Sequence, residues 1–104
     1  METFRVQGTA ARRAPGNRLV AITGVNASGN LEVLAERVLP DTECSVEVAT
    51  AVAGFRDLWQ AVIIAFFERS APGGLRFSIN DGGARPETVT LRLMQSLRLM
   101  EVEQ

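Results

Sequence analysis

Hydrophobic and polar residues alternate in several short stretches of the chain, a pattern typical of β-strands with one buried face. The clearest stretch is residues 43–50, which would bury Cys44, Val46 and Val48 and expose Glu43, Ser45 and Glu47. Residues 75–80 alternate in the same way. Residues 87–93 also alternate and predict a further strand, with Val89, Leu91 and Leu93 facing inward and Thr88, Thr90 and Arg92 facing outward.

Two apolar runs at residues 19–22 and 31–34 flank a stretch of small residues at 26–30, and this arrangement predicts a β-hairpin. Gly29 can adopt a positive φ without steric cost, which suits a tight turn. Ser28 would then lie at the tip of the hairpin with its hydroxyl exposed to water. An exposed hydroxyl in such a turn is well placed for covalent attachment by another enzyme.

From residue 54 to residue 69 the apolar residues recur every three or four positions, which predicts an amphipathic helix. Its apolar stripe consists of Phe55, Leu58, Trp59, Val62, Ile63, Phe66 and Phe67. Because a domain of this size needs large side chains in its core, we expect the stripe to pack across a sheet rather than to bind a ligand. Ile64 lies off the stripe and is a candidate contact for a partner. Residues 95–103 predict a short C-terminal helix.

The order of these elements predicts an α+β fold, a two-layer sandwich in which a mostly antiparallel sheet of about five strands packs on one long helix. The predicted order is β-β-β-α-β-β, followed by the short C-terminal helix. The long helix would form a crossover connection, right-handed if the strands that it joins are parallel. Residues 1–17 are predicted to form a flexible arm and residues 18–104 a single domain. We interpret Arg12 and Arg13 in the arm as a solvated basic pair, with contact to a phosphate as the alternative.

Composition narrows the classes of function. The 104 residues carry a formal net charge of −1, which argues against general binding to nucleic acid, since that requires a basic excess. One cysteine cannot form an internal disulfide. The first residues lack the pattern of a secretory signal, and the longest apolar run, residues 61–67, is too short to cross a bilayer. We therefore expect a cytoplasmic protein without a membrane partner.

Self-contained catalysis is not expected. The chain contains no histidine, and all eleven of its basic residues are arginines, which are poor bases. Ser28 therefore has no general base, and a serine without a base is a weak nucleophile. We interpret Cys44 as a small buried hydrophobe, with a reactive thiol as the alternative. Four strand carboxylates could in principle include an acid/base pair, but we expect solubilising surface charges; they are Glu32, Glu36, Glu43 and Glu47.

Two blocks of sequence carry a resemblance to a known family. Residues 28–34, Ser-Gly-Asn-Leu-Glu-Val-Leu, resemble the modification site of the acyl carrier subunits of malonate decarboxylase, where Ser-Gly-Asp precedes a strand of this type. Residues 79–93 resemble the same family's Asp-x-Gly-Ala turn and the arginine-bearing strand that follows it. The similarity runs from Leu19 onward in the family's order. Asn30 stands where the family usually has Asp.

The resemblance implies a function for the loop serine. Members of the family carry 2'-(5''-phosphoribosyl)-3'-dephospho-CoA, joined to the serine through a phosphodiester, which here would fall on Ser28 between flanking residues that include Gly29 and Asn30. The thiol of this group holds an acetyl group that an acyltransferase subunit exchanges for malonyl, and decarboxylase subunits then release CO2. A separate transferase attaches the group. Residues 18–104 would form a non-catalytic acyl-carrier domain.

Two alternatives remain open at this point. The acyl carrier subunit of citrate lyase uses the same prosthetic group and a similar turn, although its serine usually lies nearer the N-terminus. The chain could instead be an unmodified adaptor or structural subunit that docks through its sheet, with Ser28 only a turn residue. The strand-rich pattern separates the chain from the ordinary helical acyl carrier proteins, whose serine begins a helix in an Asp-Ser-Leu setting.

Overall fold

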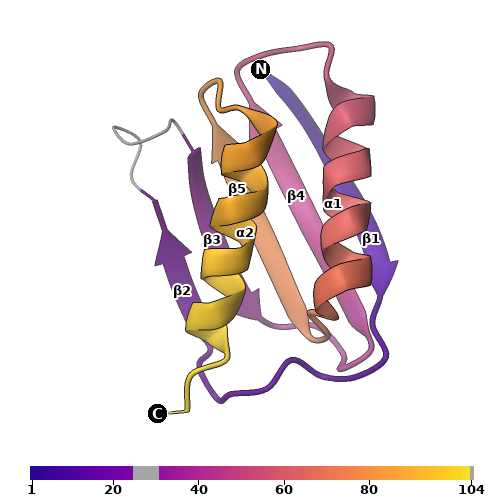
Figure 1. Cartoon of the computed structure of the whole chain (residues 1–104), viewed down its shortest axis with the longest axis vertical. Coiled ribbons are helices and arrows are strands. Elements are labelled where there is room, and N and C mark those ends of the chain that lie inside the picture. The colour runs from indigo at the N-terminus through magenta and orange to yellow at the C-terminus, as the bar shows by residue number, and fades with distance from the viewer. Residues whose placement is uncertain (25–30, 104) are drawn as a thin grey trace.

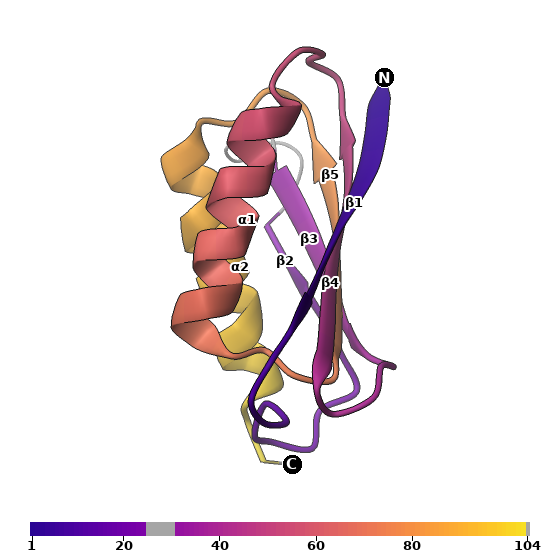
Figure 2. The same cartoon turned by 90° about the vertical axis from the view of Figure 1, so that its right-hand side faces the viewer.

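Within the part of the chain that is described, residues 1–24 and 31–103, two helices cover one face of a five-stranded sheet (Figures 1 and 2). The structure is a computed structural model. Its elements in chain order are β1 (Glu2–Thr9), β2 (Val20–Thr23), β3 (Leu31–Arg37), β4 (Glu43–Thr50), α1 (Arg56–Ser70), β5 (Leu75–Asp81) and α2 (Pro86–Met100). This arrangement confirms the predicted α+β sandwich of a sheet on helices, with a second long helix in the helical layer.

The strands lie in the order β1-β4-β5-β3-β2. The central pair, β4 and β5, is parallel, and the other neighbouring pairs are antiparallel. Parallel neighbours need a crossover connection, and α1 provides it, as predicted. The predicted hairpin is also confirmed, since β2 pairs antiparallel with β3 from Val20 opposite Glu36 to Thr23 opposite Val33.

The first strand was not predicted. Residues 1–17 were expected to form a flexible arm, whereas Glu2–Thr9 pairs along the whole of β4, from Glu2 opposite Thr50 to Thr9 opposite Glu43. The apolar alternation fails at Gly8, because a Cβ there would lie 2.5 Å from Cδ2 of Phe67. The backbone of β1 lies so close to the Phe67 ring at this position that there is no room for a side chain. The apolar residue that would have completed the alternation is therefore absent from the sequence.

The segment after β1 is also held to the body of the protein. Ala14 is buried, and the guanidinium group of Arg37 donates hydrogen bonds to the carbonyl oxygens of Ala14 (2.8 Å), Pro15 (3.1 Å) and Met100 (2.9 Å). Arg13 donates to the carbonyl oxygens of Ala14 and Gly16. Arg13 therefore stabilises a local turn of the backbone.

Residues 87–93 form the first part of α2 and not a strand, so that prediction was wrong. The buried residues of α2 follow a helical spacing: Val89, Leu93, Ser96, Leu97 and Met100. Leu91, which a strand would have turned inward, is 55% exposed. Val89 and Leu93 fit both patterns, because a spacing of four residues is a multiple of two and also about one helical turn. The predicted C-terminal helix is the end of this same helix.

The core lies between the sheet and the two helices. Cys44, Val46 and Val48 are buried, as the alternation along β4 predicted, but Ser45, which was predicted to face outward, is buried as well. On α1 the confirmed part of the stripe is Trp59, Ile63, Phe66 and Phe67, which are buried, with Val62 partly buried. Phe66 meets Phe77 of β5 edge to face, with 5.4 Å between ring centroids. Phe55 and Leu58 at the start of the stripe remain about half exposed, because they border a pocket described below.

Candidate functional site

The predicted attachment site, Ser28 with Gly29 and Asn30, lies outside the described residues, but the structure describes the residues on both sides of it. β2 ends at Thr23, and β3 begins at Leu31, whose side chain is fully buried. The residues between them therefore connect two neighbouring antiparallel strands, as the sequence predicted.

α2 supports the β2 side of this connection. The buried hydroxyl of Ser96 donates a 2.9 Å hydrogen bond to Oγ1 of Thr23. Gly24 has a φ of +81°, and a Cβ there would lie 2.4 Å from the carbonyl oxygen of Leu31 and 3.0 Å from Nε of Arg92. The backbone at the base of the connection thus packs against the guanidinium group of Arg92, and only glycine fits at position 24.

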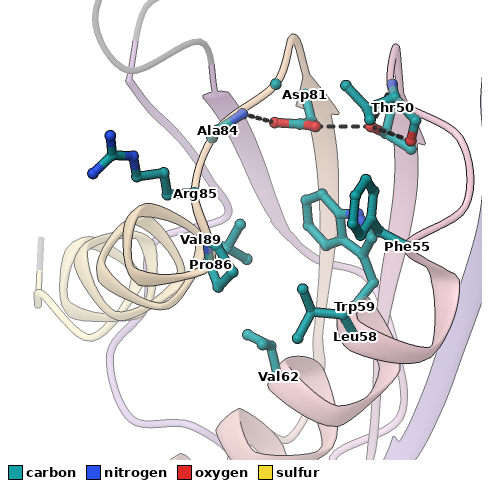
Figure 3. Close-up of a pocket in the computed structure, with 12 residues that line it drawn as sticks. Thr50, Phe55, Leu58, Trp59, Val62, Asp81, Ala84, Arg85, Pro86 and Val89 are labelled. Carbon is teal, nitrogen blue, oxygen red and sulfur yellow. Dashed lines mark hydrogen bonds between the residues drawn. The ribbon is translucent and has the colours of Figure 1, made fainter.

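Asp81 lies on the other side, at the end of β5 and opposite Leu31 in the antiparallel pair. Its side chain is buried. Oδ1 accepts a 2.8 Å hydrogen bond from the backbone N–H of Ala84, and Oδ2 accepts a 2.7 Å hydrogen bond from the hydroxyl of Thr50 (Figure 3). The carboxylate therefore joins the ends of two parallel strands to the turn that begins α2. The Asp-Gly-Gly sequence predicted the turn but not this bond to β4.

A pocket of about 290 Å³ opens beside Asp81, between the first turns of α1 and α2 (Figure 3). Its walls are mainly apolar and include Val52, Phe55, Leu58, Trp59, Val62 and Val89, while Thr50 and Asp81 supply polar atoms. Figure 3 shows the Trp59 ring and the Leu58 side chain facing Val89 and Pro86 across the pocket. The sequence predicted these α1 residues as core, and no local pattern distinguishes a pocket wall from a core face.

Two of the described lining residues are charged, Asp81 and Arg85. Asp81 is buried in the wall, whereas Arg85 is exposed and its guanidinium group extends away from the Trp59 side of the pocket (Figure 3). The charged group that is buried in the pocket wall is therefore the Asp81 carboxylate. This arrangement suits a neutral or cationic guest better than an anion.

Cys44 does not have the properties of a nucleophile. It is 2% exposed, and burial raises the pKa of its thiol from 9.0 to about 11. Only the thiolate is reactive, so this thiol is inert at neutral pH. The interpretation of Cys44 as a buried hydrophobe is confirmed.

Two of the four strand carboxylates are paired with arginine side chains. Glu36 accepts a 3.0 Å bond from Arg76, and Glu47 lies 2.9 Å from Arg5. Among the described residues, no cluster of three or more histidine, cysteine, aspartate or glutamate side chains could bind a metal. In the same ranges, no helix is both long enough and apolar enough to span a bilayer.

Comparison with known proteins gives a consistent picture. Residues 19–100 match the family model described as malonate decarboxylase delta subunit. The chain is 58% identical over 98 residues to the malonate decarboxylase acyl carrier protein of Bradyrhizobium diazoefficiens, an alignment that covers 94% of this chain and 93% of the relative. It is 45% identical over 101 residues to that of Xanthomonas euvesicatoria pv. vesicatoria, covering 97% and 96%.

A solved structure is similar as well. It is a chain in the crystal structure of a Pseudomonas malonate decarboxylase hetero-tetramer in complex with malonate. The TM-score is 0.82 and the sequence identity 34%, and the alignment covers 96% of this chain and 99% of the other. The same strand and helix arrangement thus occurs in a subunit of a multisubunit assembly.

Proposed function

The chain belongs to the malonate decarboxylase acyl carrier protein (delta subunit) family, and we propose that it carries acetyl and malonyl thioesters on a prosthetic group attached to Ser28. The proposed group is 2'-(5''-phosphoribosyl)-3'-dephospho-CoA, joined through a phosphodiester, with Gly29 and Asn30 in the turn around the attachment. The observation that carries the proposal is the family match over nearly the whole chain, with the predicted serine turn between two paired strands.

The described residues flank the predicted attachment site and offer no strong nucleophile that would attack a bound thioester. Leu31 and the Thr23–Ser96 hydrogen bond fix the strand ends on both sides of the connection. No histidine or lysine is present, and the buried Cys44 thiol stays protonated at neutral pH, so no strong nucleophile of the described fold attacks a thioester. The prosthetic group, when bound, supplies the thiol on which the acyl group is held.

We propose three kinds of partner: an acyltransferase subunit that exchanges acetyl for malonyl, decarboxylase subunits, and the transferase that attaches the prosthetic group. The structural relative in a malonate decarboxylase hetero-tetramer supports assembly with other subunits. Ile64, 46% exposed on α1, remains the predicted partner contact. All of these partners would meet the carrier in the cytoplasm.

The attachment can be tested by intact mass. Co-expression with the cognate transferase should add a mass of nucleotide size to the chain, and Ser28→Ala should remove that addition because Ser28 is the proposed attachment residue. Ser78→Ala is the matched control, since Ser78 lies on β5, outside the predicted turn. An adduct that persists on Ser28→Ala would place the attachment elsewhere. A wild-type chain that keeps its bare mass would favour the adaptor function.

The citrate lyase alternative has less support. The relatives described above are malonate decarboxylase proteins, and the similarity to them covers more than nine-tenths of the chain. We therefore favour malonate as the acyl source. Transfer of malonyl, and not of a citrate-derived group, onto the loaded carrier by its acyltransferase would support this choice.

A further inference from the structure

The pocket between α1 and α2 lies at the end of the molecule that bears the proposed attachment site. Leu31, the first residue of β3, is paired with Asp81, and Asp81 lines the pocket. Neighbouring strands are about 4.8 Å apart, so the attachment connection returns to the sheet one strand away from the pocket wall. Figure 1 shows the end of β2, the start of β3 and the first turns of both helices at this same end.

The size and walls of the pocket suit a small apolar group. Its volume of about 290 Å³ is just below the range for small-molecule sites, which runs from about 300 to 1,000 Å³. Aromatic and aliphatic side chains of α1 face Val89 and Pro86 of α2 across it (Figure 3). A short acyl group therefore fits the pocket better than a long chain does.

The charge of the pocket discriminates between the two acyl groups of the proposed cycle. An acetyl thioester is neutral, whereas a malonyl thioester ends in a carboxylate. The Asp81 carboxylate is buried in the wall, and Arg85 extends away from the interior, so a second carboxylate would meet a like charge without a facing cation. Like charges repel more strongly in a partly buried site than in water.

We propose that this pocket receives the acetyl thioester end of the arm tethered to Ser28 and excludes the malonyl thioester. This inference rests on the proposed carrier function. The walls around Trp59 shield the acetyl thioester from water between turnovers. The malonyl thioester stays outside, where a decarboxylase subunit can reach it.

The pocket can be tested without the arm. Trp59 is the single tryptophan of the chain and lines the pocket, so its fluorescence reports on occupancy. We expect S-acetylpantetheine to change the emission of the unmodified protein saturably. S-malonylpantetheine should require at least about tenfold higher concentration, which corresponds to about 1.4 kcal/mol. An equal response to both probes, or no response to either, would overturn the proposal.

Two matched variants on one helix localise the effect. Leu58 and Ile64 are 45% and 46% exposed on α1, but only Leu58 lines the pocket. Leu58→Glu should abolish the response to S-acetylpantetheine, and Ile64→Glu should leave it unchanged, with circular dichroism confirming the fold of both. Asp81→Asn should narrow the gap between the acetyl and malonyl probes. A Leu58→Glu protein that responds like wild type contradicts the assignment.

The loaded carrier gives a second test. A short flexible tether supplies an effective concentration in the millimolar range, so even weak intrinsic binding populates the pocket. We expect hydroxylamine to cleave the acetyl thioester on the wild-type carrier at least about twofold more slowly than free S-acetylpantetheine, and Leu58→Glu to restore the free rate. Equal rates on a carrier of correct loaded mass would refute the pocket while leaving the carrier function intact. If the intact mass shows no prosthetic group on the chain, the fluorescence titration of the unmodified protein still tests whether the pocket binds the acetyl thioester.

Discussion

Gly24 is the residue on which the base of the β2–β3 connection depends. Its φ of +81° belongs to the left-handed region, and the space where a Cβ would lie is filled by the Leu31 carbonyl oxygen and the Arg92 guanidinium group. Conformation and space therefore both require glycine. At Gly54, which precedes α1, the φ is +96° but nothing lies within 4 Å of an added Cβ. A comparison of substitutions at these two positions therefore distinguishes the cost of a positive φ from the cost of a steric clash.

Gly24→Ala should destabilise the protein more than Gly54→Ala does. The shared conformational cost is about 1–2 kcal/mol, and Gly24→Ala adds the displacement of backbone and of Arg92. Urea titration of both variants measures the difference in the free energy of unfolding. Equal losses would show that the backbone at residue 24 relaxes freely.

At the scale of elements, β1 and α2 account for the differences between prediction and structure. β1 has few apolar residues, yet it pairs along the full length of β4 and covers part of the core with Val6. α2 contains a seven-residue alternating segment, yet it forms a helix because Leu97 and Met100 extend the apolar spacing of Val89 and Leu93. β1 thus depends on pairing with a strand distant in sequence, whereas α2 follows an apolar spacing that becomes clear only over the whole length of the helix.

Removal of residues 1–17 should abolish cooperative unfolding. Without β1 the edge of β4 and the inward side of Phe67 lose their cover, and the bonds from Arg37 to Ala14 and Pro15 are lost. A chain that begins at residue 18 should show a broad thermal transition by circular dichroism. Retention of a sharp transition near the wild-type midpoint would instead support the predicted flexible arm.

At the scale of the whole molecule, the layer of two helices on one sheet buries the thiol of Cys44 and leaves a pocket between the helix starts. Burial raises the pKa of the thiol to about 11 from an ordinary value of 9.0. The folded state therefore holds this proton more tightly than the unfolded state does. The resulting stabilisation is complete below pH 9 and is lost as the pH rises towards 11.

The chain has no lysine or tyrosine, so in this alkaline range Cys44 is the side chain expected to titrate. We expect the free energy of unfolding to fall between pH 9 and pH 11 in the wild-type protein. The fall should be much smaller in Cys44→Ala, which has no thiol. Denaturant titrations at pH 8 and pH 10.5 compare the two proteins, and parallel losses in both would rule out Cys44 as the cause.

The sequence alone determined the elements whose signal is local: the alternation of β4 and β5, the hairpin of β2 and β3, most of the α1 stripe and the absence of a base for a catalytic serine. The tertiary structure decided what depends on distant segments. β1 becomes a strand through β4, Asp81 joins the turn to Thr50, and Phe55 and Leu58 border a pocket because α2 lies opposite them. Local patterns encode which face of an element is apolar, whereas only packing decides what covers that face.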